Sequence, residues 1–200
     1  MLTFYTNPKS RGRIARWALE EVGRPYETVV LEYGTTMKAP EYLAINPMGK
    51  VPALVHDGHV VTECAAVICY LADAFPEARL MPADRAAFFR WMFFGAGPLE
   101  SAVTNKALGV HVPPERHSMV GYGSLDLVTN TLAQRLAASP YLCGDTFSAA
   151  DIYVGSQIGF GLRFGSIEAR PEFGAYWTRI SSRPAQFRAS GIDNALIKKE

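Results

Sequence analysis

Short extended segments alternate with helical segments over roughly the first seventy residues. Alternating apolar and polar positions predict strands over Leu2–Tyr5 and Glu27–Leu31, because a half-buried strand repeats every two residues. Between them, apolar positions recur at helical spacing over Arg11–Val22, and Gly23 follows as a residue suited to end the helix. This order is typical of βαβ units and predicts a mixed sheet.

A hairpin and a helix complete this first region. Pro52–His56 and His59–Thr62 are predicted strands that flank Asp57 and Gly58. Both turn residues tolerate positive φ and therefore suit a two-residue hairpin turn, so the two strands form an antiparallel pair. Glu63–Ala74 follows as a predicted helix and ends just before a proline, which disfavours helical geometry in the residue before it.

The pattern changes near residue 76. Residues 83–190 show no strand alternation, and the predicted helices are Arg85–Gly95, Met119–Ala138, Ser148–Leu162 and Glu172–Ser182. The third begins with a capping box, in which Ser148 caps the helix and Asp151 stands at its third position. We therefore predict an α/β domain over residues 1–78, with a mixed four-stranded sheet, and an all-α helical domain over residues 83–200.

Composition excludes several classes of function. Of the 200 residues, 48% are apolar and 20% are charged, which is enough apolar material for a sizeable core. Lys and Arg total 20 against 19 for Asp and Glu, so we expect no nucleic-acid partner. The longest apolar run, Cys64–Ala72, is far shorter than the ~18 residues of a membrane span. With no secretory signal after Met1, a cytoplasmic location is expected.

The cysteines indicate reduced thiols. Cys64, Cys69 and Cys143 are odd in number and include no CxxC pair, which fits a reducing compartment better than a disulfide framework. Their spacing forms no ligand pattern with the histidines, so no metal site is expected.

The loop that follows the first strand is the most informative stretch. It contains Lys9, Arg11 and Arg13 and opens a helix, where free backbone N–H groups and the helix dipole favour an anion or a thiolate. The basic side chains either bind an anion or form a solvated basic face. Ser10 is placed either to cap the helix or to donate a hydrogen bond to a ligand thiolate. Tyr5 is a second possible donor, or else an aromatic packing residue of the strand.

Two further segments carry features of a ligand site. Val51-Pro52 precedes the third strand, and a cis bond there would turn the Val51 backbone outward to pair with an extended ligand. Glu63-Cys64 opens the next helix, where a carboxylate complements the helix dipole.

These residues resemble one family over nearly the full length of the chain. The Val51-Pro52 strand entry, Glu63 at the start of the third helix, the capping sequence FSAADI and the ending Tyr176–Pro184 are similar to those of cytosolic glutathione transferases. The likeness is to bacterial-type members with a serine-like site in the first loop. It implies the glutathione transferase fold, with a thioredoxin-like N-terminal domain and an all-helical C-terminal domain.

The resemblance also implies a binding site for reduced glutathione as co-substrate. The Val51 backbone would pair with the cysteinyl part, with Pro52 in cis, and Lys50 would lie toward the glycine carboxylate. Glu63 would meet the γ-glutamyl end, whose carboxylate the backbone N–H of Cys64 would hold. The family most often has serine at that last position, and a thiol is a much weaker donor than a hydroxyl.

For catalysis, the family uses a tyrosine, serine or cysteine in the first loop. Ser10 matches the serine or cysteine placement, with Asn7 and Arg11 as helpers, whereas Tyr5 lies early for the tyrosine placement and is held in reserve. The implied reaction is attack of the glutathione thiolate on a small hydrophobic electrophile, as expected of a detoxification enzyme that acts as a homodimer. The electrophile pocket would draw on an aromatic stripe formed by Phe88, Phe89, Trp91, Met92, Phe93 and Phe94. Some of these side chains must face the core, which is the more common role of an aromatic stripe on a helix.

Other functions remain open on the same fold. A glutathione-dependent peroxidase, reductase or isomerase would use the same thiolate. A non-catalytic binding or assembly module is favoured by Cys64, whereas Lys50, Val51, Pro52 and Glu63 favour an enzyme. A dithiol mechanism lacks its nucleophile, because the first loop contains no cysteine.

Overall fold

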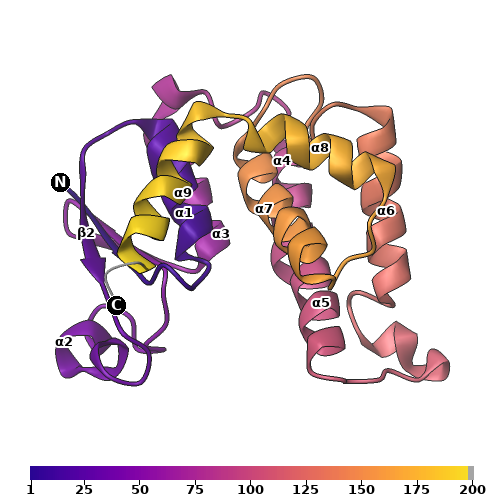
Figure 1. The fold of residues 1–200 in the computed structure, drawn as a ribbon, viewed down its shortest axis with the longest axis horizontal. Coiled ribbons are helices and arrows are strands. Elements are labelled where there is room, and N and C mark those ends of the chain that lie inside the picture. Colours follow the sequence, from indigo (N-terminus) through magenta and orange to yellow (C-terminus); the bar gives the residue numbers. More distant parts are fainter. Residues whose placement is uncertain (198–200) are drawn as a thin grey trace. The chain divides into compact units, whose positions relative to one another are not determined.

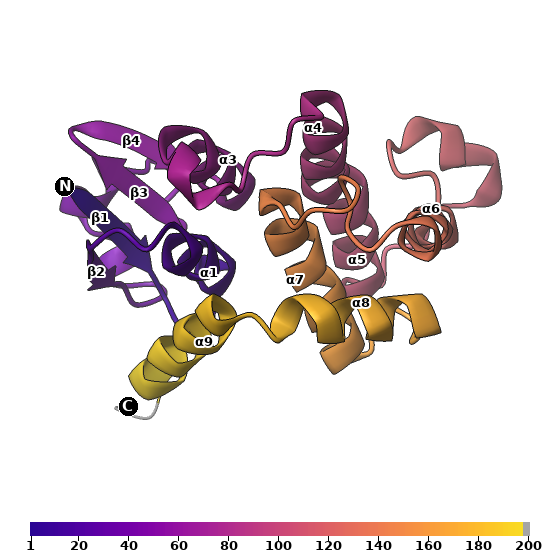
Figure 2. The same cartoon turned by 90° about the horizontal axis from the view of Figure 1, so that it is seen from above.

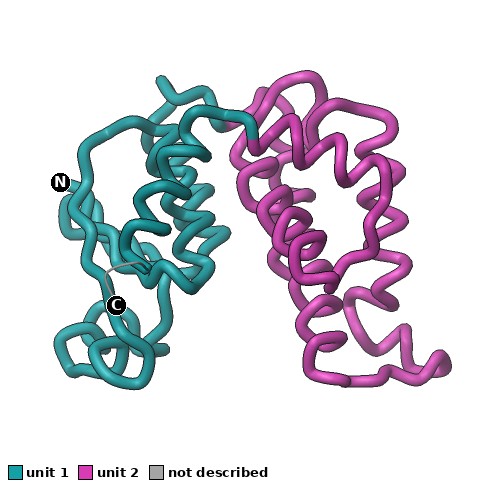
Figure 3. The backbone as a smooth tube through the Cα atoms, viewed as in Figure 1, with its two compact units in different colours: residues 1–80, 182–200 teal, residues 81–181 magenta. Residues whose placement is uncertain are grey.

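A computed structural model of the chain describes residues 1–197. These residues form two compact units (Figure 3), of which unit 1 contains residues 1–80 and the chain from residue 182 onward, and unit 2 contains residues 81–181. Among the described residues, no helix is both long enough and apolar enough to cross a membrane.

Unit 1 is built on a four-stranded mixed sheet with the strand order β2-β1-β3-β4. The strands are β1 (Leu2–Thr6), β2 (Tyr26–Val30), β3 (Ala53–His56) and β4 (His59–Thr62). β2 runs parallel to β1, whereas β3 is antiparallel to both β1 and β4. The predicted mixed sheet is therefore confirmed. The hairpin is confirmed too, since Asp57 and Gly58 have φ values of 48° and 85°, as the predicted turn requires.

Helices α1 (Gly12–Val22) and α3 (Cys64–Ala74) lie side by side on one face of this sheet (Figure 2). Both begin and end within a residue of their predicted bounds. The short helix α2 (Pro40–Leu43) and a 3₁₀ turn at Thr36–Lys38 were not predicted, because segments of three or four residues have too few positions to show a period.

The last helix, α9 (Pro184–Ile197), lies along α1 (Figure 1) and belongs to unit 1. The predicted all-helical domain, residues 83–200, assigned this segment to the other domain. The physical reason for the difference is a buried ion pair, in which Arg16 Nε of α1 lies 2.8 Å from Asp193 Oδ1 of α9. Both side chains are almost fully buried, and separating them would leave uncompensated buried charge.

Unit 2 is entirely helical in its main elements. These are α4 (Arg85–Phe94), α5 (Glu100–Ala107), α6 (Leu125–Ala138), α7 (Ala149–Phe164) and α8 (Pro171–Ser181). A π-helical turn, Gly95–Leu99, joins α4 to α5 and accommodates Pro98 within the helix, so the helix continues past its predicted end at Gly95. The predicted helix over Met119–Ala138 instead begins at Leu125, where the Ser124 side chain accepts the Leu127 amide.

The predicted capping box at the start of α7 is confirmed. The Ser148 amide and hydroxyl both donate to Asp151 Oδ2, at 2.8 and 2.9 Å. Asp151 Oδ1 accepts two further hydrogen bonds, from the Leu142 amide at 2.9 Å and the Tyr176 hydroxyl at 2.8 Å. This buried carboxylate therefore joins the preceding loop, α7 and α8.

Candidate functional site

The loop between β1 and α1 is closed by the Ser10 hydroxyl. Ser10 Oγ donates to the Asn7 carbonyl at 2.7 Å and accepts the Gly12 amide at 2.9 Å. The hydroxyl therefore binds the first residue of α1, and both predicted uses of Ser10 stay predictions. The side chain is only partly buried, so Ser10 stands at the surface of unit 1 beside the N-terminal end of a helix.

The Asn7 side chain forms hydrogen bonds with the backbone of this loop and of Leu31. Its side chain is 1% exposed. Nδ2 donates to the Leu31 carbonyl at 2.8 Å, and Oδ1 accepts the Lys9 amide at 2.9 Å. Because both ends of the amide are bound to backbone groups, Asn7 contributes to the site by fixing the backbone on which Ser10 stands.

Gly12 allows α1 to start close to the sheet. A Cβ at this position would lie 2.0 Å from Thr6 Oγ1 and 3.0 Å from Ser10 Oγ. Thr6 is fully buried, so it cannot move aside without disturbing the core.

We expect Gly12→Ala to lower the free energy of unfolding by roughly 1–3 kcal/mol, because a methyl group forced into packed space displaces its neighbours. Gly191→Ala is the matched control, since Gly191 lies in α9 with nothing within 4 Å of its Cβ position. Helix propensity makes that control neutral or stabilising by up to ~1 kcal/mol. Thermal melts of both variants make the comparison, and equal melting temperatures would contradict the close approach at Gly12.

Tyr5 packs against an apolar cluster of unit 1. Its ring centroid lies 5.5 Å from that of Tyr42, and it packs against a cluster that includes Leu31, Met37 and Ala53. Burial raises the pKa of Tyr42 to about 12. Tyr5 therefore makes the packing contacts expected of a strand aromatic, and its use as a reserve donor stays a prediction.

The segment before β3 is held in one shape by its own polar groups. The Lys50 carbonyl accepts Asn46 Nδ2 at 2.8 Å and also the Tyr42 hydroxyl. Gly49 has φ +57°, and a Cβ there would lie 2.6 Å from the Met37 carbonyl. These contacts lead the chain into the Val51-Pro52 peptide bond.

The Val51–Pro52 peptide bond is cis, as the family resemblance implied. Within residues 1–197, neither the Val51 amide nor its carbonyl has a protein hydrogen-bond partner. Buried backbone groups are nearly always paired, and Val51 is only partly buried. Its amide and carbonyl are therefore available to an extended ligand at this edge of unit 1.

Lys38 is a residue that the sequence analysis missed. Its ammonium group donates to the Met48 carbonyl at 2.9 Å, and the side chain covers Gly49 at the approach to Lys50. Lys38 and Lys50 are both exposed, so two cations flank this segment. No sequence signal marked Lys38, because its contact to Met48 depends on the fold of the 3₁₀ turn.

Glu63 begins α3 in an unusual backbone conformation. Its φ and ψ are 67° and 121°, and positive φ is costly for a residue other than glycine. The Glu63 carbonyl accepts the Val67 amide, yet its carboxylate makes no capping hydrogen bond to the helix. The Glu63 carboxylate therefore does not serve as the cap of α3.

Cys64 connects the two helix starts. Its thiol lies 3.6 Å from the Arg11 carbonyl, so the first residue of α3 touches the residue immediately before α1. Two helix N-termini, each with a partial positive charge, therefore converge beside Ser10. The structure brings together Ser10, Arg11, Glu63 and Cys64, and the Asn7 carbonyl accepts the Ser10 hydroxyl.

The other cysteines lie outside this region. All three cysteines are free thiols. Burial raises the pKa values of Cys69 and Cys143 to about 11, so both are protonated near neutral pH. Among the described residues, no group of three or more His, Cys, Asp or Glu side chains is arranged to hold a metal ion.

The aromatic stripe of α4 is divided between core and surface. Phe88, Trp91 and Met92 are buried, whereas Phe89 and Phe93 are 46% and 71% exposed. The stripe thus contributes three side chains to the core of unit 2, leaves two phenylalanines exposed, and has Phe94 partly buried.

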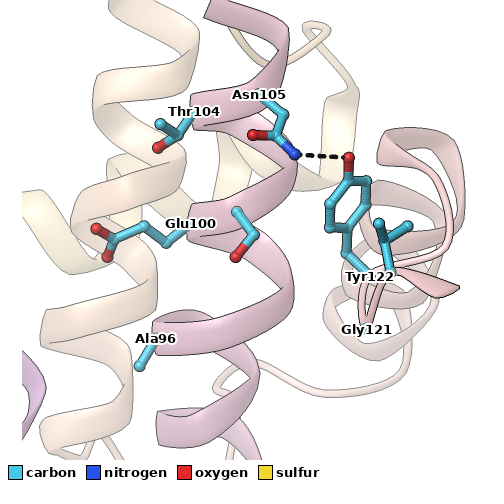
Figure 4. A pocket seen from close by; sticks show the side chains of 8 residues that line it. Ala96, Glu100, Thr104, Asn105, Gly121 and Tyr122 are labelled. Carbon is cyan, nitrogen blue, oxygen red and sulfur yellow. Dashed lines mark hydrogen bonds between the residues drawn. The ribbon is translucent and has the colours of Figure 1, made fainter. Parts of the chain in front are cut away.

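Unit 2 also contains a pocket beside α5. A cavity of about 510 Å³ is formed by α5 and the segment around Tyr122. Its polar lining residues are Glu100, Ser101, Thr104, Asn105 and Tyr122. Asn105 Nδ2 and the Tyr122 hydroxyl point toward each other across it, 2.9 Å apart (Figure 4). This pocket is more polar than the aromatic stripe predicted for the electrophile.

Comparisons with known proteins agree with this architecture. Residues 11–74 match the family model of the glutathione S-transferase N-terminal domain, and residues 122–184 match that of the C-terminal domain. The chain is similar to glutathione S-transferase 3 of Zea mays, with 30% identity over 84% of this chain and 82% of that protein.

Solved structures extend the likeness to the whole fold. A glutathione transferase from Methylococcus capsulatus superposes with a TM-score of 0.80 at 29% identity, covering 98% of this chain and 100% of the other. A sphingomonad glutathione S-transferase in complex with glutathione has a TM-score of 0.77 at 28% identity, covering 96% and 98%. The fold is therefore a thioredoxin-like domain followed by a helical domain. The chain belongs to the glutathione S-transferase family.

Proposed function

We propose that the protein is an enzyme that binds reduced glutathione in unit 1 and activates its thiol for attack on an electrophile. The observation that carries this proposal is the convergence of two helix N-termini at the Cys64–Arg11 contact, beside Ser10. A glutathione anion would be favoured there by both helix dipoles. The bound glutathione of the sphingomonad relative supports the same ligand for this chain.

Each end of the tripeptide has a proposed partner in unit 1. The cysteinyl part pairs with the Val51 backbone ahead of cis-Pro52, and the γ-glutamyl ammonium group meets the Glu63 carboxylate. The Cys64 amide holds the γ-glutamyl carboxylate. At the other end, Lys50 attracts the glycine carboxylate, and we add Lys38 as a second cation there because it covers the same segment.

Ser10 is the proposed hydrogen-bond donor to the glutathione thiolate, with Arg11 supplying positive charge nearby. Its hydroxyl would turn from the Asn7 carbonyl toward sulfur and keep the Gly12 amide as a donor. A thiol with a pKa near ~8.5 needs about 2.7 kcal/mol of preferential stabilisation to titrate two units lower. One hydrogen bond to a charged acceptor contributes roughly 1.5–3 kcal/mol, so Ser10 and the helix dipoles together suffice.

The electrophile is proposed to bind in unit 2. A small hydrophobic compound remains our substrate class, and the α5 pocket adds hydroxyl and amide groups that suit a polar substituent on it. A homodimer is supported by Phe89 and Phe93, whose exposure on one helix suits burial against a second copy. The three free thiols support a cytoplasmic location.

The main alternative is a non-catalytic glutathione-transferase-like module. The observation that favours it is Cys64, since a thiol replaces the hydroxyl that the family most often places beside the γ-glutamyl carboxylate. A glutathione-dependent peroxidase, reductase or isomerase would share the thiolate and differ only in the second substrate.

Steady-state assays with glutathione and three kinds of second substrate test the proposal. We expect saturable turnover of an aromatic electrophile, and Cys64→Ser should leave kcat similar while lowering KM for glutathione about two- to ten-fold, through a better hydrogen bond. Faster turnover of a hydroperoxide or a mixed disulfide would reassign the reaction. No turnover in either protein would favour the non-catalytic module.

A further inference from the structure

The C-terminal helix reaches the loop that carries Ser10 through one arginine. Arg13, in the first turn of α1, donates from Nη1 to the Pro8 carbonyl at 3.2 Å and from Nη2 to Asn194 Oδ1 at 2.9 Å. One planar guanidinium group thus bridges the β1–α1 loop and α9. The Pro8 carbonyl lies two residues before Ser10, between the Asn7 carbonyl that binds Ser10 and the Lys9 amide that binds Asn7.

The α9 end of this bridge is firmly anchored. The neighbour of Asn194 is Asp193, whose carboxylate is buried against Arg16. Burial raises the pKa of Asp193, and the guanidinium groups of Arg16 and Arg13 oppose that rise. Arg13 is held on α9 by the Asn194 amide oxygen, which is next in sequence to this buried pair.

The loop end of the bridge is the Pro8 carbonyl. Proline has no amide hydrogen, so Pro8 can be held through its backbone only at the carbonyl. Asn7 and Ser10 supply further hydrogen bonds within the loop. A guanidinium on the carbonyl between them limits how far Ser10 can move when its hydroxyl turns toward a ligand.

We propose that Arg13 is a positioning residue for the glutathione-activating loop and that α9, through Asn194, is a structural part of that site. The effect of Arg13 on the glutathione thiol rests on the proposed function. Arg13 touches neither the thiol nor the rest of the tripeptide; it acts through the Pro8 carbonyl on Ser10. The C-terminal helix thus contributes to thiol activation as well as to the stability of unit 1.

Two variants and one matched control test the proposal. Asn194→Ala removes the α9 end of the bridge at an exposed position. Arg13→Lys retains the charge but not the planar fork that reaches two acceptors. Arg188→Ala is the control, because Arg188 ties α9 to Glu20 by an exposed ion pair of 3.0 Å and does not contact the loop.

The first measurement is amide hydrogen exchange, which needs no glutathione. We expect exchange at residues 9–12 to accelerate about three- to ten-fold in Asn194→Ala and Arg13→Lys, because local opening becomes easier. In Arg188→Ala the same amides should exchange at the wild-type rate. Equal exchange in all four proteins would overturn the proposal.

The second measurement is the pH profile of thiolate absorbance in the glutathione complex. The two bridge variants should raise the thiol pKa by about half a unit. At a fixed pH below the pKa, this is about a three-fold loss of thiolate. Arg188→Ala should leave the thiol pKa unchanged. A wild-type profile in Arg13→Lys and Asn194→Ala would overturn the inference and leave the proposed function intact. Absence of a thiolate in the wild-type protein would instead overturn the proposed function and, with it, the chemical role of Arg13.

Discussion

Ser10→Ala is expected to raise the pKa of the bound glutathione thiol by about 1–2 units, which corresponds to the loss of one hydrogen bond to a charged acceptor. At pH 7, kcat/KM for the electrophile should fall about ten- to a hundred-fold, in proportion to the lost thiolate. The variant also loses the bond from the Gly12 amide to Ser10 Oγ, so its stability should fall by about 1 kcal/mol. The thiol pKa separates the two effects, because a loss of folded protein lowers activity without moving it.

Two control variants show whether the change in thiol pKa comes from the Ser10 hydroxyl. Ser10→Thr keeps a hydroxyl on the same atom and should hold the thiol pKa near the wild-type value. Tyr5→Phe should also leave the thiol pKa unchanged, since the Tyr5 ring packs against Tyr42. An unchanged pKa in Ser10→Ala together with a raised pKa in Tyr5→Phe would assign the thiolate to Tyr5.

Asp151→Asn should destabilise unit 2 by about 3–5 kcal/mol, which is a large part of the stability of a typical domain. The carboxylate accepts hydrogen bonds from Leu142, Ser148 and Tyr176, and it is fully buried. Asparagine has an NH₂ group where aspartate has one of its two carboxylate oxygens. That NH₂ group would face other hydrogen-bond donors and leave buried groups unpaired.

Thermal or urea unfolding checks this effect against two further variants. Asp145→Asn removes a charge from an exposed position in the same loop and should change stability by less than ~0.5 kcal/mol. Ser148→Ala removes one donor and the cap, so a loss of about 1–2 kcal/mol is expected in a protein that still folds. Equal melting of Asp151→Asn and Asp145→Asn would show that the buried network contributes little.

Local patterns were sufficient to predict most of the sheet and several helix starts. The alternation around Asp57-Gly58 defined the hairpin, because side-chain period and turn chemistry act within a few residues. The FSAADI sequence defined the start of α7 for the same reason, since Ser148 and Asp151 are three residues apart.

The features that the sequence did not reveal depend on contacts between distant residues. Helix α9 was not predicted, and its attachment to unit 1 depends on Arg16 and Asp193, which are 177 residues apart. Continuation of the helix through Pro98 depends on a π turn whose Gly95 carbonyl accepts Gln157 from α7. A pattern confined to one segment cannot report such tertiary contacts.

In the candidate site too, some residues were predicted from local sequence and others depend on contacts between distant residues. Val51, Pro52, Glu63 and Cys64 were identified from motifs that are continuous in sequence, and the cis bond and the Cys64–Arg11 contact were then found in the structure. Lys38, by contrast, joins the site only through the fold. Asn7 stays a predicted catalytic helper, and its buried side chain binds the backbone of Leu31 and Lys9.

The most direct test of the proposed function is a calorimetric titration of the wild-type protein with reduced glutathione near pH 7, repeated in buffers that differ in ionisation enthalpy. The account predicts saturable binding with release of a proton, because the site stabilises the thiolate over the thiol. Binding without proton release would contradict thiol activation. No binding at millimolar glutathione would contradict the glutathione site itself and leave the non-catalytic module as the better account.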